Sequence, residues 1–446
     1  MERARRVISD SVAYEPLEDS VDDDTNPEHS QSQPRSRFSR LEYGVFFLLG
    51  VSMLWAWNML LAAAPYFHQR FESNEWTATH YQPSIMSVST VTNLISAYTL
   101  ARVQKNVSYP WRVTLALLMN CFFFTLLAIS TITFEGVSAK GYFAFLMVMV
   151  WGASLATGIN QNGVFAYVSS FGREEYTQAI MSGQGVAGVL PCIVQIISVL
   201  VVPRKAKGDH GSQALSPKSA FGYFMTATGV SVLTLLAFLY LLRTRPDLQI
   251  KSTEEENAAL VDDDRVHDKT VSLWTLFKKL RYLAIAVFLC FTVTMLAFPV
   301  YTSTIFSVND PEKSRIFDPS VFIPLAFLFW NVGDLLGRLL VVVPGLSLGH
   351  RPWVAFVFSV ARVGFIPLYL FCNVKGNGAL VSSDFFYLFI VQLLFGITNG
   401  YLVSSCMMGA GHWVSPHERE AAGGFMSMML VGGLTAGSLL SFLVAN

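Results

Sequence analysis

Residues 282–305 read YLAIAVFLCFTVTMLAFPVYTSTI, a run of 24 residues that contains no charged side chain. An α-helix needs roughly 20 mostly apolar residues to cross the hydrocarbon core of a bilayer. The segment has no alternation of polar and apolar residues, so a transmembrane β-strand is excluded. Because lipid offers no hydrogen-bond partners to backbone groups, we expect this segment to form a transmembrane α-helix.

Ten other apolar runs of similar length occur along the chain. The sequence therefore predicts an all-α polytopic membrane protein with 11 transmembrane helices. The predicted spans are 43–67, 84–102, 111–133, 141–168, 178–202, 219–242, 282–305, 319–343, 352–373, 384–409 and 421–444.

The distribution of charge supports this architecture. Only 14% of the 446 residues are charged, whereas a soluble domain has roughly 25%. Residues 1–42 hold 16 of the charged residues, and residues 243–281 hold another 16. The predicted parts are a disordered acidic cytosolic tail at 1–42, a six-helix bundle at 43–242, a charged cytosolic loop at 243–281 and a five-helix bundle at 282–446. Two bundles joined by a long loop are typical of secondary transporters.

Lysine and arginine residues in short loops mark the cytosolic side of a membrane protein. Three loops place the N-terminus in the cytosol and the C-terminus on the opposite side, through Arg35, Arg37, Arg40, Arg102, Lys105, Arg112, Arg243, Arg245, Lys278, Lys279 and Arg281. One loop opposes this orientation, through Arg204, Lys205, Lys207 and Lys218. We keep the orientation that three loops favour.

Several function classes lack support in the sequence. The net charge is zero and no basic tract lies among exposed aromatic residues, so we expect no nucleic-acid binding. The five cysteines lie in apolar runs, and no CxxC or HExxH motif occurs, so we predict no metal site and no cofactor. The spans contain no nucleophile with a neighbouring base, which argues against an enzyme.

Residues 330–338 read WNVGDLLGR and place two charges in the middle of a span. A charge at bilayer depth costs at least about 2.5 kcal/mol on insertion scales. Asp334 and Arg338 are four residues apart and share a helix face with Asn331. These groups could bind vicinal hydroxyls, because the carboxylate accepts and the guanidinium donates hydrogen bonds. The alternative is an internal ion pair that only stabilises the fold.

Two more polar sites lie in or beside the later spans. Arg362 is a mid-span charge, for which we expect a structural or gating partner, either Asp334 or a polar group on another helix. His412 follows span ten and precedes residues 417–420, which we expect to form a solvated cytosolic turn. Proton coupling through His412 is a further alternative.

Spans four and one carry polar and aromatic residues at depth. Asn160, Gln161 and Asn162 form a row of amides that suits either the edge of a heterocyclic base or contacts between helices. Trp57 lies deep in span one, where it could stack on a planar ligand or pack in the core. Glycine-rich segments at 182–188 and in span eleven predict close helix packing.

The ordered set of motifs resembles the equilibrative nucleoside transporter family from about Tyr43 to the C-terminus. The matching segments are Trp57-Asn58, Gln161, 180–185, 219–224, 334–338, Ala361-Arg362, 399–402 and Ala422-Gly423. The resemblance implies facilitated, bidirectional transport of nucleosides, and in some members of nucleobases, by alternating access. It also implies a fold similar to the major facilitator arrangement with one helix missing.

The resemblance also assigns roles to residues. In the family, the residues that match Trp57 and Gln161 face the base, those that match Asp334 and Arg338 serve the ribose, and the one that matches Leu434 lines the cavity. Further pocket candidates are Asn58, Leu61, Val91, Asn93 and Leu94. The alternative function is a proton-coupled carrier of nucleosides or of another small polar solute, although an aspartate beside an arginine should stay ionised.

The resemblance is strongest to fungal members, which are similar to vacuolar transporters. We therefore expect a vacuolar or lysosome-like membrane, with the plasma membrane as the alternative. The tail adds Tyr14-Glu15-Pro16-Leu17, which fits a tyrosine-based signal for the sorting machinery.

Overall fold

The computed structural model describes residues 39–102, 108–134, 136–201, 217–244 and 271–444. The chain divides into Met1–Arg37 and Phe38–Asn446, and every described residue belongs to the second part. Tyr14 to Leu17 and the acidic stretches of the central loop lie outside the described residues. Within the described residues the secondary structure is helical, apart from one isolated bridge between Ile305 and Val374.

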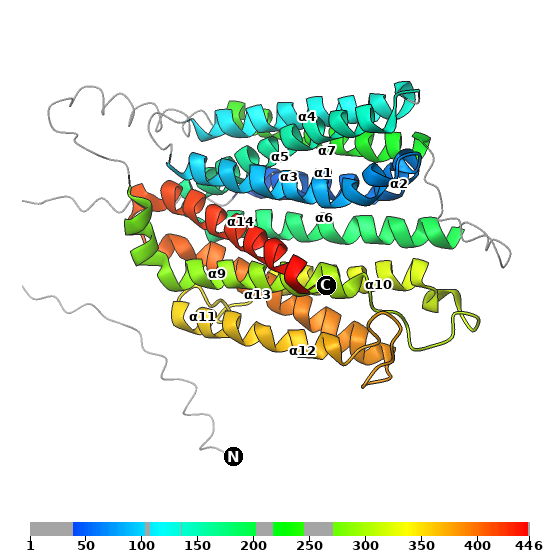
Figure 1. Cartoon of the computed structure of the whole chain (residues 1–446). Helices are drawn as coiled ribbons and strands as arrows, with labels where there is room; N and C mark the ends of the chain where they lie inside the picture. Colours follow the sequence, from blue (N-terminus) through cyan, green and yellow to red (C-terminus); the bar gives the residue numbers. More distant parts are fainter. Residues whose placement is uncertain (1–38, 103–107, 135, 202–216, 245–270, 445–446) are drawn as a thin grey trace, which may run out of the picture. The chain divides into compact units, whose positions relative to one another are not determined.

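The helices form two sets, which we call the first half and the second half (Figure 1). The first half contains α1 (Arg40–Ala62), α2 (Ala64–Phe71), α3 (Glu75–Arg102), α4 (Tyr109–Thr133), α5 (Ala139–Ser170), α6 (Glu174–Val201) and α7 (Pro217–Thr244). The second half contains α9 (Leu273–Thr302), η1 (Arg315–Phe317), α10 (Pro319–Leu340), α11 (Pro352–Ala361), η2 (Arg362–Gly364), α12 (Phe365–Leu370), η3 (Phe386–Leu393), α13 (Leu394–Gly409), η4 (Ala410–His412), η5 (Pro416–Glu418) and α14 (Arg419–Val444).

Each of the 11 predicted spans coincides with helix. Among the described residues, ten helical stretches are long and apolar enough to cross a membrane. The eleventh span corresponds to α3, which begins at Glu75 rather than near residue 84 and is too polar to count among the ten. Some of its polar residues face protein: Ser89, for example, accepts a hydrogen bond of 2.9 Å from Ser154 of α5. Elsewhere, large apolar side chains such as Trp353 are exposed, as expected for a surface in contact with lipid.

Spans nine and ten are not the regular α-helices that the sequence analysis assumed. Span nine changes from α11 to a 3₁₀ turn at Arg362–Gly364 and continues as α12. Pro367 explains the change, because it has no N–H to donate to residue 363 and its ring crowds that carbonyl. Span ten opens with eight residues of π-helix, Phe386–Leu393. Stretches of 3₁₀-helix and π-helix still pair backbone groups within the segment, so a membrane tolerates them.

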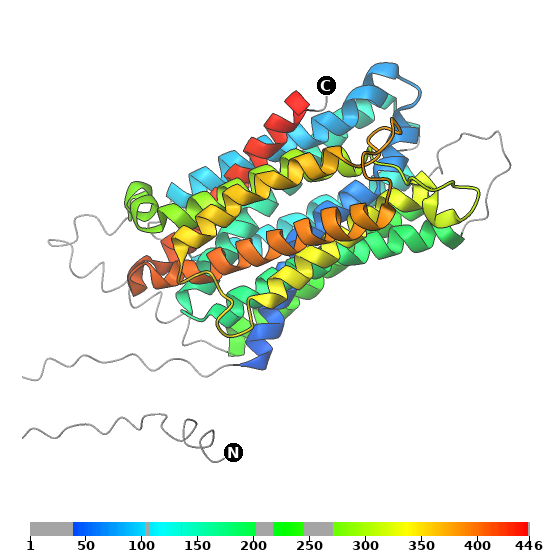
Figure 2. The ribbon, with the colours of Figure 1, turned by 90° about the horizontal axis from the view of Figure 1, so that it is seen from below.

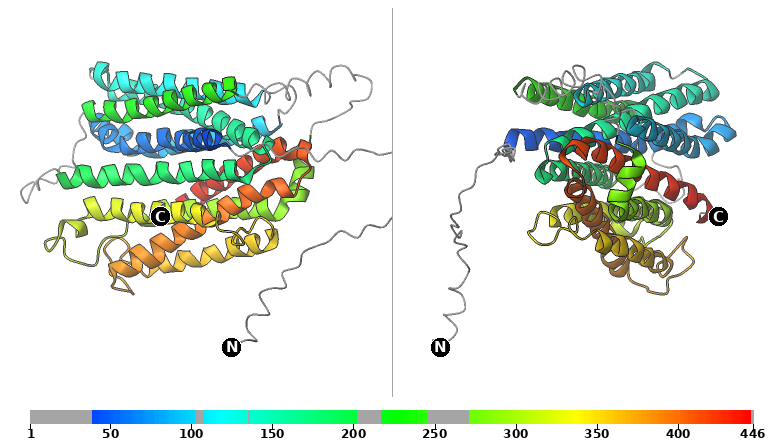
Figure 3. Two further views of the ribbon diagram at one scale, coloured as in Figure 1. Left: turned by 180° about the vertical axis from the view of Figure 1, so that it is seen from behind. Right: turned by 90° about the vertical axis from the view of Figure 1, so that its left-hand side faces the viewer.

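The two halves meet on two sides. On one side α6 packs between α1 and α10, and on the other side α14 packs on α5, α3 and α9. Figure 2 shows the yellow and orange helices of the second half in front, and the left view of Figure 3 shows the first half above the yellow and orange helices of the second half. We call the end of this bundle where α1 and α14 begin the near end, and the opposite end the far end.

Glycines set the closest helix contacts, as the sequence predicted for α6 and α14. A Cβ atom on Gly183 would lie 2.1 Å from Phe47 O of α1, and one on Gly433 would lie 2.3 Å from Phe288 O of α9. The tightest pair, α10 and α13, was not predicted. There the glycines are reciprocal: Gly333 and Gly337 press on the α13 backbone, and Gly396 and Gly400 press on the α10 backbone. Small residues four apart let helix backbones approach closely in a membrane.

Candidate functional site

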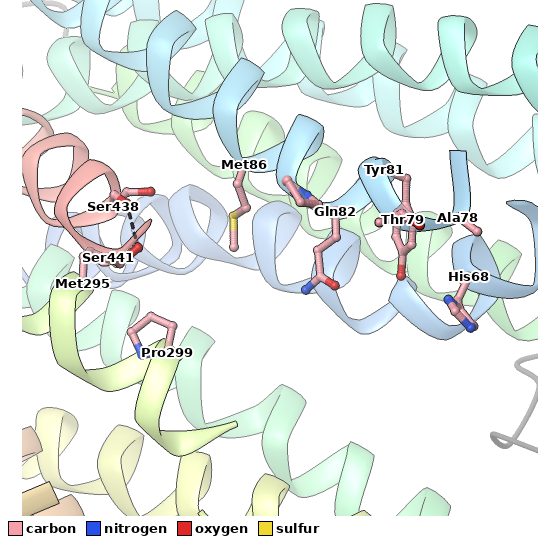
Figure 4. Close-up of a pocket in the computed structure, with 11 residues that line it drawn as sticks. His68, Ala78, Thr79, Tyr81, Gln82, Met86, Met295, Pro299, Ser438 and Ser441 are labelled. Carbon is pink, nitrogen blue, oxygen red and sulfur yellow. Dashed lines mark hydrogen bonds between the residues drawn. The ribbon is translucent and has the colours of Figure 1, made fainter. Parts of the chain in front are cut away.

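A cleft of about 410 Å³ opens between the halves toward the far end (Figure 4). Its walls come from α2 and α3 of the first half and from α9 and α14 of the second, and Gln82, Met86, Met295 and Ser438 are among its lining residues. Asn93 lies two helical turns beyond Met86 on α3, and Leu434 lies one turn beyond Ser438 on α14. The cleft therefore leads along these faces toward two of the predicted pocket residues.

The near end is closed by contacts between the halves. A Cβ atom on Gly423 of α14 would lie 2.3 Å from Phe165 O of α5. His412 Nε2 lies 2.7 Å from Glu174 Oε1, which joins η4 of the second half to the first residue of α6. The contact between α6 and α10 is not confined to the near end, because Arg315 before α10 donates to Leu200 O at 2.9 Å where α6 ends. The structure therefore combines a closed near end with a cleft on the far side.

Asp334 and Arg338 form the predicted pair on one face of α10. Arg338 Nε donates to Asp334 Oδ2 at 2.7 Å, and both side chains are buried. Arg338 Nη1 also donates across the interface between the halves, to Met181 O at 2.9 Å and to Gln184 Oε1 at 3.1 Å. Gln184 in turn reaches α1, where its Nε2 lies 3.3 Å from Met53 Sδ. One guanidinium therefore links a carboxylate of the second half to polar groups of the first.

The same carboxylate continues into a buried polar network in the second half. Asn399 donates to Asp334 Oδ1 at 2.7 Å and accepts from Thr294 Oγ1 at 2.8 Å. Arg362 donates to Thr294 Oγ1 at 3.0 Å and to Cys290 O at 2.8 Å. Of the two expected partners, Asp334 and a polar group on another helix, Arg362 binds the second. It is connected to Asp334 through Thr294 and Asn399.

The asparagines near this pair have local partners. Asn331 Nδ2 donates to Phe327 O at 2.9 Å, and its Oδ1 would lie 2.2 Å from a Cβ atom on Gly188 of α6. Asn58 Nδ2 donates to Ala187 O of α6 at 2.7 Å. Asn58 of α1 and Asn331 of α10 therefore flank one stretch of α6. Trp57, next to Asn58, is half-buried and packs against the apolar core of the first half.

The three amides of span four separate into different environments. Asn162 Oδ1 accepts a hydrogen bond of 2.7 Å from Arg112 of α4, so its role is contact between helices. Asn160 is fully buried, and its amide atoms have no partner among the described residues. Gln161 is buried, with 8% of its surface exposed, and no described residue forms a hydrogen bond with its side chain. Gln161 therefore keeps its donor and acceptor available.

The remaining pocket candidates are scattered. Leu94 and Leu434 are half-buried against the core that the two halves share. Asn93 Oδ1 is buried without a partner among the described residues. Val91 is 51% exposed and Leu61 is 36% exposed, so these two lie at a surface of the described structure.

The turn at the near end differs from the expected solvated one. Glu418 is buried, accepts from Lys279 Nζ at 2.6 Å and from Ser415 Oγ at 2.6 Å, and forms a capping box with Ser415. Lys279 neutralises the carboxylate that burial would otherwise penalise. His412 also has a partner, Glu174, that its place in the sequence did not indicate.

The sequence analysis missed the polar roles of Gln184, Asn399 and Thr294. Gln184 was part of a segment noted only for its small residues, and Thr294 lies in an otherwise apolar run. The spacing Gly396-x-x-x-Gly400 was a signal for Asn399, because glycines four apart mark a helix face that packs closely. Asn399 lies between these two glycines, beside that contact.

Known proteins resemble this chain in sequence. The sequence profile described as nucleoside transporter matches residues 146–446. The chain is 30% identical to the nucleoside transporter FUN26 of Saccharomyces cerevisiae, over 97% of this chain and 87% of that protein. It is also 30% identical to equilibrative nucleoside transporter 1 of Rattus norvegicus, over 92% of this chain and 98% of that protein.

Solved structures show the same fold at low identity. The crystal structure of FucP, a major facilitator superfamily transporter in the outward conformation, matches with a TM-score of 0.58. It is 12% identical and covers 90% of this chain and 91% of that chain. The human organic anion transporter MFSD10 matches with a TM-score of 0.55 at 14% identity, over 90% of this chain and 92% of that chain. The fold is therefore a major facilitator arrangement.

Proposed function

The chain belongs to the nucleoside transporter family, and we propose that its two halves expose one central site alternately to each side of the membrane. Its activity is facilitated transport of nucleosides, and it is a transporter rather than an enzyme. The cleft at the far end and the closed near end support one of the two facing states. The other state requires the near-end contacts to separate.

One observation carries the proposed sugar site: Arg338 binds Asp334 of its own helix and Gln184 of the other half at the same time. Vicinal hydroxyls of a ribose can donate to the carboxylate and accept from the guanidinium. A bound sugar would replace hydrogen bonds that Arg338 now makes across the interface between the halves. Its binding would therefore be coupled to the rocking of the halves. Asn331, one turn before Asp334, would support the pair.

We assign the base to residues of the first half. Gln161 has an unpaired amide that can donate to and accept from a heterocycle. Trp57 offers a half-buried ring for stacking. Leu434 and Asn93 would line the inner end of the route from the cleft, whereas Asn58, Leu61, Val91 and Leu94 would only border it. Free nucleobases, which lack the sugar, would bind through the first-half residues alone.

The test is uptake of radiolabelled uridine and adenosine into proteoliposomes that contain the purified protein. Saturable equilibration that is independent of a pH gradient, and that is lost in Asp334→Ala, is the expected result. Uracil and adenine in the same assay test nucleobase transport. Uptake that needs an inward proton gradient would instead establish proton coupling, and no uptake from monodisperse protein would refute the substrate.

We also propose that the near end faces the cytosol and that the protein resides in a vacuolar or lysosome-like membrane, with the plasma membrane as the alternative. Lys278, Lys279 and Arg281 at the start of α9 support the orientation. The relationship to a fungal transporter and the signal Tyr14-Glu15-Pro16-Leu17 support the compartment. A C-terminal fluorescent fusion, with and without Tyr14→Ala, tests both the compartment and the sorting signal.

A further inference from the structure

Three side chains that can bind a metal ion meet at the near end, away from the proposed substrate site. Glu174 is the first residue of α6, His350 lies in the loop between α10 and α11, and His412 ends η4. One ligand atom from each residue lies within 4.8 Å of the ligand atoms of the other two. The rings of His350 and His412 have their centroids 4.5 Å apart.

The loop that carries His350 is fixed beside η4. A Cβ atom on Gly349 would lie 2.7 Å from the Cα of Gly409, so the two backbones are in direct contact. Trp413 Nε1 donates to Gly349 O at 2.9 Å. Trp413 directly follows His412, and Gly349 directly precedes His350. The two histidines are therefore held side by side by backbone packing and not only by their own side chains.

We propose that these three residues form a binding site for a divalent transition metal, with Zn²⁺ as the reference ion. Two imidazole nitrogens and one carboxylate oxygen are a ligand set that zinc accepts, with water in the fourth position. Ligand atoms around a tetrahedral zinc are roughly 3.4 Å apart, given bonds of about 2.0–2.2 Å. His412 Nε2 lies 2.7 Å from Glu174 Oε1, so on metal binding this hydrogen bond would be replaced: Nε2 loses its proton and the two atoms move apart by about 0.7 Å.

The position of the site gives it a consequence for transport. Glu174 belongs to the first half and both histidines belong to the second, so a bound ion joins the halves across the closed near end. The ion would favour the state in which the near end is closed, because the ligands separate when that end opens. This consequence depends on the proposed alternating access, whereas metal binding itself does not.

Binding is tested by titrating Zn²⁺ into the purified full-length protein, from which the affinity tag has been removed, in a calorimeter. We expect one site, which is lost in His350→Ala and in Glu174→Gln, and no binding of Mg²⁺. The matched control is His417→Ala, because His417 is also exposed at the near end but lies outside the triad. Equal Zn²⁺ binding by the wild type and by His350→Ala would refute the site. If His350→Ala is not monodisperse, His412→Ala takes its place.

The coupling is tested by uridine counterflow with and without Zn²⁺, with each variant compared only with itself. We expect Zn²⁺ to slow counterflow several-fold in the wild type and in His417→Ala, but not in His350→Ala. Saturating Zn²⁺ that binds and leaves counterflow unchanged would refute the coupling and leave the site intact. A protein that binds Zn²⁺ but shows no counterflow of any nucleoside would refute the proposed function instead.

Discussion

Asn399 of α13 donates a hydrogen bond of 2.7 Å to Asp334 of α10, between two helices whose backbones are in contact. A Cβ atom on Gly400, the next residue, would lie only 1.9 Å from Asp334 O. The carboxylate is therefore fixed both by its amide partner and by the helix contact beneath it. Its position depends on residues 65 positions away in the sequence.

Asn399→Ala should destabilise the protein by about 1–3 kcal/mol, because Asp334 Oδ1 and Thr294 Oγ1 both lose a buried partner. The midpoint of thermal unfolding in detergent measures the effect. The matched control is Ser404→Ala on the same helix, since Ser404 is buried and its hydroxyl has no partner among the described residues. Equal shifts for the two variants would show that the Asn399 amide is not needed.

Arg338→Ala should reduce uptake of uridine more than uptake of 2′,3′-dideoxyuridine. Loss of a hydrogen bond to a charged group costs about 1.5–3 kcal/mol, which corresponds to roughly 10–100-fold in kcat/KM. The ratio of the two substrates is measured on one preparation, so a lower yield of folded protein does not affect it. A proportional loss for both substrates would contradict the proposed role in binding the sugar.

Gln161→Ala should reduce discrimination between bases, because the amide has no partner among the described residues and is available to a ligand. Competition of uridine, cytidine, adenosine and guanosine for uptake ranks their affinities. We expect the affinities of the four nucleosides in the variant to differ by about tenfold or less, which is a narrower range than in the wild type. Asn162→Ala is the contrasting variant: it should lower stability through loss of the Arg112 contact and leave the ranking intact. An unchanged ranking in Gln161→Ala would move the base site elsewhere.

Gly400→Ala should lower thermal stability by about 1–3 kcal/mol, because the added methyl group forces α10 and α13 apart. Gly229→Ala in α7 is the control, since a Cβ atom there meets no atom within 4 Å. That control should be neutral or slightly stabilising, because alanine favours helix by up to about 1 kcal/mol over glycine. Thermal unfolding of the two variants side by side decides the question.

Much of the fold could be predicted from the sequence because lipid imposes a local rule. Each apolar run must be a helix, so all 11 spans were found, and the pairing of Asp334 with Arg338 followed from their spacing of four residues. The break at Arg362–Gly364 was also readable in principle from Pro367, but the run of apolar residues concealed it.

Other parts of the candidate site could not be predicted, because they depend on which helices become neighbours. Gln184 acquires its polar role only when α6 meets α10, and Glu174 meets His412 only when the two halves close. Burial of Glu418 likewise depends on Lys279, which lies 139 residues earlier. A single sequence carries no direct record of such distant pairs.

The glycine contact between α10 and α13 has a thermodynamic consequence for the transport cycle. Two helices whose backbones touch at four glycines cannot slide without losing that contact, so Asp334, Arg338 and Asn399 travel as one unit. In the proposed sugar site, these three residues would then keep the same geometry in both facing states. If the proposed sugar site holds, a difference in affinity for the sugar between those states would arise from what α6 adds or withdraws, namely Gln184 and the carbonyl of Met181.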